Sequence, residues 1–232
     1  MNNYMKILLL MNENSYAGRQ YAQQLKLHKI SFDIITIGSY PEFDIDENSR
    51  CGGFWNPLTL LELGIKDEIY KFKSLKSDDL ICFLELKKYD LSIQGGTGII
   101  NQNIIDKFKY GILNFHPGDL PNYRGCSAPE WQVYEGKNVV STCHFIDQGI
   151  DSGPILEKKI LDVSKENYFK FRASIYPQTS FFLVDIINRI IDDIRFLDRK
   201  TEQKSKAFIY RKYIGNTIIK NLKIKFLNNE IG

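Results

Sequence analysis

The run Met5-Lys6-Ile7-Leu8-Leu9-Leu10-Met11 is a short apolar stretch that ends at Asn12-Glu13-Asn14, and this pattern predicts a buried β-strand. Ser15 can cap a helix that continues to about His28, and residues 31–37, with Phe32, Ile34 and Ile35 as apolar content, predict a second strand. A strand, a helix and a strand in succession form a βαβ unit, whose strands are parallel and whose crossover is right-handed. The sequence therefore predicts an α/β fold built on a mostly parallel sheet flanked by helices.

The rest of the chain up to residue 197 predicts further helices and strands of the same fold. Residues 38–56 are rich in Gly, Pro, Asp and Asn and are expected to form a long loop. Residues 167–197 predict a long helix that is interrupted at Tyr176-Pro177, because proline cannot donate to the helical ladder. The other expected elements are helices at 79–88, 101–108 and 128–135 and strands at 90–94, 111–115, 139–146 and 154–161.

The last part of the chain, residues 198–232, is expected to form an extension of a main domain at 1–197. Residues 208–213 and 217–226 mix Ile with Lys and predict a β-hairpin, which is a candidate for pairing two copies into a homodimer. The segment carries nine Lys/Arg against three Asp/Glu, which fits either a bound phosphorylated ligand or RNA, or a merely solvated hairpin. Lysine and asparagine are common throughout the chain, which favours the solvated hairpin, so no nucleic-acid partner is expected.

Composition limits the compartment and the partners. With 232 residues, 43% apolar and 25% charged residues and a net charge of +3, the chain is typical of a globular domain. Its apolar runs are too short to span a membrane, and the first of them lacks the flanks of a signal peptide. The four cysteines are scattered without the spacing of a metal site. We therefore expect a cytoplasmic protein with no membrane partner and no bound metal.

Two polar motifs follow predicted strands. The first is Asn114-Phe115-His116-Pro117-Gly118-Asp119-Leu120-Pro121-Asn122-Tyr123-Arg124-Gly125, and the second is Asp147-Gln148-Gly149-Ile150-Asp151-Ser152-Gly153. Asn114 and His116 face one side of an extended segment, and the carboxyl ends of parallel strands meet in one crevice, where Asp151 can join them. An amide donor, an imidazole and a carboxylate suit acyl transfer. Taken singly, each residue also has a purely structural interpretation as a cap or turn residue.

Together these motifs resemble the signature of the formyltransferase superfamily that uses N10-formyltetrahydrofolate. Its pattern is roughly N-x-H-P-S-L-L-P-x-Y-R-G, followed by a strand and then D-x-G-x-D-x-G. The match covers about residues 90–160 and includes Ser127-Ala128-Pro129-Glu130-Trp131. One departure is Gly118-Asp119, where Ser-Leu is commoner, and it is not expected to touch the reactive positions. The resemblance implies a Rossmann-like fold and N10-formyltetrahydrofolate as the cofactor.

By the same resemblance, Asn114, His116 and Asp151 are the catalytic residues. A primary amine attacks the formyl carbon of the cofactor, and Asn114 and protonated His116 donate to the oxyanion. The base is either His116 or a water held by Asp151. The glycines of the cofactor site either permit close approach to a pterin ring or mark a flexible turn, and His144 is expected to be a structural or supporting residue. The implied cofactor-binding residues are Ile93, Gly95, Gly96, Thr97, Gly98, Ile146, Asp147 and Asp151.

Three classes of the superfamily differ in the amine they formylate. Residues 12–18 hold a single glycine where glycinamide ribonucleotide transformylases carry a glycine-rich phosphate loop. Too few residues follow the main domain for the barrel of methionyl-tRNA formyltransferases. The chain therefore most resembles the sugar N-formyltransferases, which implies a nucleotide-linked amino sugar, with dTDP-4-amino-4,6-dideoxyglucose as the expected substrate. The alternatives are another amine, a hydrolase that releases formate, or a non-catalytic folate or nucleotide binder. The expected substrate contacts are Tyr123, Arg124, Gly125, Tyr176 and Tyr210.

Overall fold

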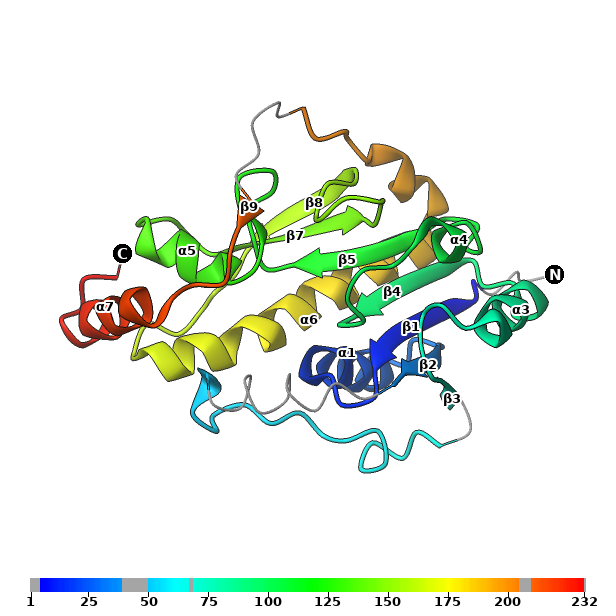
Figure 1. Cartoon of the computed structure of the whole chain (residues 1–232), viewed down its shortest axis with the longest axis horizontal. Helices are drawn as coiled ribbons and strands as arrows, with labels where there is room; N and C mark the ends of the chain where they lie inside the picture. The colour runs from blue at the N-terminus through cyan, green and yellow to red at the C-terminus, as the bar shows by residue number, and fades with distance from the viewer. Residues whose placement is uncertain (1–4, 39–49, 67–68, 205–209, 232) are drawn as a thin grey trace.

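A computed structural model describes residues 5–38, 50–66, 69–204 and 210–231 of the chain (Figure 1). Within these ranges the main sheet has seven strands, in the order β3-β2-β1-β4-β5-β7-β8. The first five strands of that order are parallel, while β7 is antiparallel to both of its neighbours. The strands are β1 (Ile7–Asn12), β2 (Asp33–Ile37), β3 (Ile69–Phe72), β4 (Leu91–Gly95), β5 (Ile112–His116), β7 (Val140–Phe145) and β8 (Ile155–Ile160). The predicted α/β fold with a mostly parallel sheet is confirmed.

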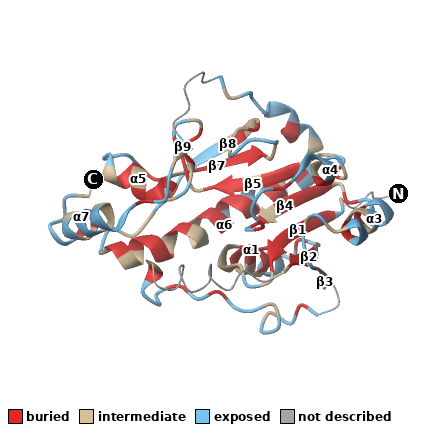
Figure 2. Ribbon diagram, viewed as in Figure 1, coloured by how far each residue is buried: buried red, intermediate tan, exposed pale blue. Residues whose placement is uncertain are grey.

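Helices cover both faces of the sheet because its central strands are apolar on both sides. In β1, Leu9 and Met11 pack with α1 (Tyr16–Leu27) and α6 (Tyr168–Asp192). Leu8 and Leu10 point to the opposite face, where α3 (Asp78–Lys87) and the short α4 (Gln102–Ile105) lie. Figure 2 shows buried residues along β1, β4 and β5 and on the side of α6 that meets the sheet. The alternation of side chains along each strand therefore assigns every second residue to a given face.

Helix α6 differs from the prediction. It continues through Pro177 without a break, from Tyr168 to Asp192. Ile175 and Phe182, on either side of the proline, are both buried. Packing on both sides of Pro177 therefore outweighs the loss of one helical hydrogen bond. A 3-10 helix, η1 (Ile194–Arg199), follows α6.

The C-terminal hairpin prediction is wrong. Residues Asn216–Leu227 form a helix, α7, and Tyr210–Arg211 form a two-residue strand, β9. Leu222 and Phe226 are four residues apart, so they share one helix face, which packs against α5 (Ala128–Tyr134) and α6. β9 pairs in parallel with β6 (Arg124–Gly125) instead of with residues 217–226. The expected dimerisation hairpin is thus absent, and residues 208–209 lie outside the described ranges.

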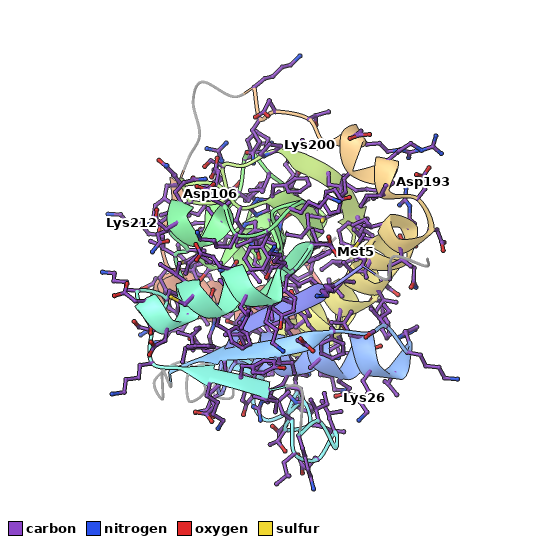
Figure 3. The ribbon with its side chains drawn as sticks, turned by 90° about the vertical axis from the view of Figure 1, so that its right-hand side faces the viewer. Met5, Lys26, Asp106, Asp193, Lys200 and Lys212 are labelled. Atoms are coloured by element: carbon purple, nitrogen blue, oxygen red, sulfur yellow. The ribbon has the colours of Figure 1, made fainter. Side chains whose placement is uncertain are left out.

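Many charged residues lie at the surface, while Arg124, Glu130 and Arg172 are buried. A view turned by 90° shows Lys26 near the end of α1 and Asp193 and Lys200 beside η1, and all three are exposed (Figure 3). No helix in the part of the chain that the structure describes is long and apolar enough to cross a membrane.

Candidate active site

Strand β5 presents Asn114 and His116 on one face of the sheet. Leu113 and Phe115 point to the other face and are buried in the core formed with α1 and α6. The two polar residues stand at the carboxyl end of the strand, where ligands bind in open parallel sheets. The expected placement of amide and imidazole on the same side is therefore what the structure has.

Asp151 reaches the same place from the loop between β7 and β8. Its backbone is left-handed, with φ 50°. One carboxylate oxygen, Oδ2, accepts a hydrogen bond of 2.8 Å from the backbone N–H of Gly125 and lies 3.6 Å from Nδ1 of His116. The structure thus brings together the three side chains that the sequence named.

His144 supports this cluster from the neighbouring strand. It stands opposite Asn114 in the β5–β7 register and is 2% exposed. Its Nδ1–H donates to the carbonyl of Phe145 (2.8 Å), so its Nε2 is an acceptor for Nδ2 of Asn114 (3.1 Å). Burial lowers the pKa of His144 to about 4, although nearby Asp151 acts to raise it. A neutral His144 therefore fixes which end of the Asn114 amide carries the donors, the supporting role that the sequence left open.

The imidazole of His116 lies deeper than Asn114. Its Nε2–H donates to the carbonyl of Tyr123 (2.6 Å), and its Nδ1 faces the Asp151 carboxylate. Both ring nitrogens therefore face protein oxygens in this structure. Asn114 is the member of the pair that contacts the adjacent pocket.

Gly118 does touch a reactive position, contrary to expectation. A Cβ at this residue would lie 2.4 Å from Nε2 of His116 and 2.5 Å from the carbonyl oxygen of Tyr123. A side chain there would occupy the space of the hydrogen bond between these two groups. The glycine at position 118, where Ser is commoner, therefore leaves the space that His116 occupies.

The reaction pocket lies beside Asn114 and Asp151 and has a volume of about 270 Å³. Three exposed apolar side chains stand at it, Ile99, Ile150 and Tyr210. Of these, only Tyr210 was among the expected ligand contacts. The expected residues that line this pocket are Gly98, Asn114, Ile146, Asp147, Asp151 and Tyr210.

Two expected cofactor residues lie elsewhere. Ile93 is fully buried in the core beneath the sheet, because its side chain points toward α1 and α6. Gly95 packs against α1, where a Cβ would come within 2.9 Å of the Cα of Gly18. These two residues serve the close packing of helix and sheet and do not line the pocket.

A second, larger pocket adjoins the first through Gly98 and Ile99, which line both. Its volume is about 850 Å³, and it lies at the ends of β1 and β2 and at the start of α1. Lys73 and Lys76 line it, and none of the described residues in its wall is acidic. Tyr176 also lines it, with its ring stacked on Trp55 at 5.0 Å. Two more expected cofactor residues, Gly96 and Thr97, belong to this wall.

Three expected substrate contacts have structural roles instead. Tyr123 and Arg124 are 6% and 5% exposed. The Tyr123 hydroxyl donates to Glu135 (2.7 Å), and burial, with Glu135 adding to it, raises the pKa of Tyr123 to about 12. Arg124 donates to Gln203, and Gly125 holds Asp151 through its backbone. Tyr123 and Arg124 lie in the same sequence motif as His116, but this position did not indicate that their side chains are buried.

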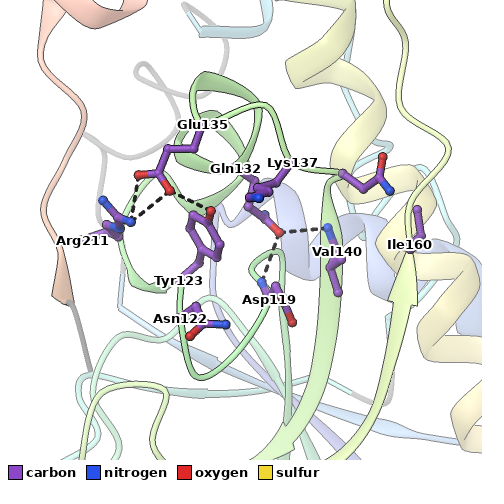
Figure 4. A pocket seen from close by; sticks show the side chains of 10 residues that line it. Asp119, Asn122, Tyr123, Gln132, Glu135, Lys137, Val140, Ile160 and Arg211 are labelled. Atoms are coloured by element: carbon purple, nitrogen blue, oxygen red, sulfur yellow. Dashed lines mark hydrogen bonds and ion pairs between the residues drawn. The ribbon is translucent and has the colours of Figure 1, made fainter. Parts of the chain in front are cut away.

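Tyr123 lines a third pocket, of about 470 Å³, on another side of its loop (Figure 4). Two of its acidic side chains form ion pairs: Glu135 with Arg211, which also lines the pocket, at 2.8 Å, and Asp119 with Lys158, which does not, at 2.6 Å. None of the three catalytic candidates lines it. We therefore assign this pocket no part in the chemistry.

Comparison with known proteins agrees with this geometry. The sequence profile described as "Formyl transferase" matches residues 5–170, well over half of the chain. Two curated methionyl-tRNA formyltransferases are similar: one from Rickettsia bellii is 45% identical over 69 residues (29% of this chain), and one from Finegoldia magna is 28% identical over 156 residues (66% of this chain). The chain spans 23% and 49% of the length of these relatives, half or less.

Solved structures share the fold at low sequence identity. A sugar N-formyltransferase from Shewanella superposes with a TM-score of 0.61 at 17% identity, covering 94% of this chain and 80% of that one. A glycinamide ribonucleotide transformylase from Symbiobacterium toebii gives 0.58 at 18% identity, covering 83% and 90%. The profile match and the site on β5 and the Asp151 loop lead to the same conclusion. The chain belongs to the formyl transferase family.

Proposed function

We propose that this protein transfers a formyl group from N10-formyltetrahydrofolate to the primary amine of a nucleotide-linked amino sugar. One observation carries the proposal: Asn114 and Asp151 line a pocket that adjoins a second, electropositive pocket. Two adjoining pockets with reactive groups in one of them suit a reaction that joins two substrates. The reaction pocket is assigned to the folate, and the second pocket to the amine.

The formyl transferase family takes its formyl group from N10-formyltetrahydrofolate, and the reaction pocket suits that cofactor. Ile99 and Ile150, which are 78% and 48% exposed, line it and offer apolar surface that a flat ring system would cover. The backbone of Gly98 has φ +81° and a Cβ would meet nothing within 4 Å, so a ligand can approach this stretch closely. Gln94 and Asp147 supply polar groups at the pocket wall. When bound, the cofactor supplies the formyl group at its N10.

The side chains then have distinct tasks. Asn114 Nδ2 gives one N–H to His144 and keeps its second N–H for the formyl oxygen as negative charge develops there. The attacking amine must lose a proton, and the departing nitrogen of the folate must gain one. His116 and Asp151, 3.6 Å apart, are placed to hold and return that proton. His144, neutral and buried, keeps the amide in its working orientation.

The second pocket supports a phosphate-bearing amine. Lys73 and Lys76 bring two positive charges, and the start of α1 adds the positive end of a 12-residue helix. The Tyr176 ring, backed by Trp55, is a rigid platform for a flat base. A nucleotide sugar has both a pyrophosphate and a base, and we propose dTDP-4-amino-4,6-dideoxyglucose as the substrate within this class.

The proposal is tested by incubating the protein with N10-formyltetrahydrofolate and a panel of amines. The panel holds dTDP- and UDP-linked 3-amino and 4-amino sugars, glycinamide ribonucleotide and methionyl-tRNA, and mass spectrometry detects the addition of one formyl group. Formylation of a nucleotide sugar, lost in Asn114→Ala and kept in the surface control Asn138→Ala, supports the proposal. Formylation of glycinamide ribonucleotide or of methionyl-tRNA alone contradicts it. Release of formate without any amine indicates a hydrolase, and no consumption of folate indicates a binding protein.

The assignment of the second pocket has its own test. Lys73→Gln/Lys76→Gln should raise the KM for the nucleotide sugar and leave kcat unchanged, because a uniform binding contact is lost. Lys66→Gln is the matched control, since this exposed lysine does not line the pocket. An unchanged KM in the double variant would show that the phosphates bind elsewhere.

A further inference from the structure

The segment after η1 returns to the active site. Thr201 exchanges two backbone hydrogen bonds with Ile155, both 2.8 Å, next to the Asp151 loop. β9 then pairs with β6, and its Tyr210 lines the reaction pocket. Figure 1 shows β9 beside the strands that carry the site. This part of the chain lies beyond residue 170, where the family match ends.

The backbone of Asp151 needs an external support. A left-handed conformation is costly for any residue other than glycine, and it persists only where the surroundings hold it. Asp147 fixes the start of the loop by accepting hydrogen bonds from Gly149 N–H (3.0 Å) and the Ser152 hydroxyl (2.6 Å). Those contacts do not involve the Asp151 peptide itself.

Gln203 supplies that support. Its amide group, Nε2, donates to the carbonyl of Asp151 (2.9 Å) and to the carbonyl of Gly153 (2.8 Å). One side chain thus bonds the peptide of the reactive carboxylate and the peptide two residues later. Both carbonyls belong to the turn that produces the left-handed conformation.

The orientation of Gln203 is itself fixed. Its Oε1 accepts from Nε (3.1 Å) and Nη2 (2.5 Å) of Arg124, which is 5% exposed. Because a guanidinium only donates, Oε1 must face Arg124 and Nε2 must face the loop. Arg124 precedes Gly125, whose N–H binds the Asp151 carboxylate. Gln203, Arg124, Gly125 and Asp151 therefore form a closed ring of contacts.

We infer that Gln203 is a positioning residue that sets the carboxylate of Asp151 against His116. The turnover readout of this inference rests on the proposed formyl transfer. Gln203→Ala removes both the acceptor for Arg124 and the donor to the carbonyls of Asp151 and Gly153. Gln203→Glu keeps the acceptor for Arg124 but replaces the donor with a second acceptor facing the two carbonyls. Glu202→Ala is the matched control, because Glu202 is exposed and adjacent.

The kinetic test measures kcat and KM for these three variants. Gln203→Ala and Gln203→Glu should each lower kcat about 10- to 100-fold, since a shift of about 1 Å in a catalytic group costs up to about 100-fold. The KM for the nucleotide sugar should stay unchanged, because no residue of the Asp151 loop lines the second pocket. Wild-type kcat in Gln203→Glu would refute the donor role, and a raised KM with unchanged kcat would refute positioning altogether.

A second readout is independent of turnover. Because the Gly125 N–H donates to a carboxylate, we expect its amide proton signal to lie downfield in a ¹H–¹⁵N spectrum. This signal should move upfield in both Gln203 variants and stay in place in Glu202→Ala. An unmoved signal in the Gln203 variants overturns the inference. If wild-type protein formylates no amine while the Gly125 signal still moves, the proposed function fails and the positioning role stands.

Discussion

Gly118→Ala is the sharpest local perturbation that the structure offers. The new methyl group would lie 2.4 Å from Nε2 of His116 and 2.5 Å from the carbonyl oxygen of Tyr123, closer than non-bonded atoms approach. Either the ring or the carbonyl must move, and both movements break the 2.6 Å hydrogen bond between them. Since Nδ1 of the same ring faces Asp151, the contact between His116 and Asp151 is lost as well.

The cost has two parts. Losing one buried hydrogen bond costs roughly 1 kcal/mol, and overpacking a filled site costs roughly 1–3 kcal/mol. We therefore expect the free energy of unfolding to fall by about 2–4 kcal/mol. For a chain of this size, each kcal/mol lowers Tm by about 2–4 °C, which gives a fall of about 4–16 °C. Turnover should fall more than the population of folded protein, because the displaced imidazole no longer meets Asp151.

Urea unfolding followed by circular dichroism measures the stability, and formyl transfer at saturating substrate measures the turnover. Gly215→Ala is the control, because a Cβ at Gly215 would meet nothing within 4 Å. Wild-type stability and turnover in Gly118→Ala would show that His116 does not depend on the space left by this glycine. A fall of equal size in Gly215→Ala would show that the effect is not specific to the site.

Three further predictions concern half-buried Asn114 and the buried His144 and Glu130. Asn114→Ala should lower kcat about 100- to 1000-fold with an unchanged urea midpoint, as for loss of one oxyanion donor, while kcat in Asn138→Ala stays at the wild-type value. Burial lowers the pKa of His144 to about 4, so the folded protein holds this side chain neutral down to lower pH than the unfolded chain does. The free energy of unfolding should therefore fall by about 3 kcal/mol as pH falls from 6.5 to 4. Urea titrations at several pH values should show a steeper pH dependence for the wild type than for His144→Gln. Glu130 is fully buried beside Arg172 (3.4 Å), so Glu130→Gln should destabilise the protein by about 3–5 kcal/mol, measured as the shift of the urea midpoint at constant slope.

The sheet was predictable because its strands are apolar runs between turn residues. The runs at 5–11, 31–37 and 111–115 correspond to β1, β2 and β5. Strand β3, Ile69–Phe72, was missed because it is four residues long, lies at the edge of the sheet and is only half buried, so its sequence carries little periodic signal. The helix predicted at 101–108 is also shorter than expected, because only Gln102–Ile105 is an α-helix, and so short an element carries little periodic signal.

The C-terminal error shows how a short apolar pattern misleads. Ile224 is exposed while Leu222 and Phe226 are buried, which is helical spacing, although Ile and Lys alternate locally as in a strand. The partners that decide between the two, on α5 and α6, are far away in the sequence. Alternation over a few residues therefore cannot replace knowledge of what the segment packs against.

The convergence of the three candidate side chains was predictable, but the contacts that support them were not. The two motifs and their spacing predicted that Asn114, His116 and Asp151 would meet, and the structure brings them together. No pattern in the sequence indicated Gln203, which forms hydrogen bonds to residues 50 and 52 positions away. Lys73 likewise follows a strand that the sequence did not reveal. A contact made by one side chain with a residue far away in the sequence produces no periodic pattern, so it cannot be predicted from the sequence in this way.

The return of the C-terminal segment to the Asp151 loop has a consequence for synthesis of the protein. Gln203 is added 52 residues after Asp151. At about 5–20 residues per second, a ribosome needs about 3–10 s to cover that distance. The last strand of the sheet, β8, ends at Ile160, so all seven strands are translated before Gln203, while the Asp151 carboxylate still lacks the side chain that orients it. The sheet of a nascent chain can therefore be complete before Asp151 is oriented, and orientation of Asp151 requires synthesis to reach Gln203.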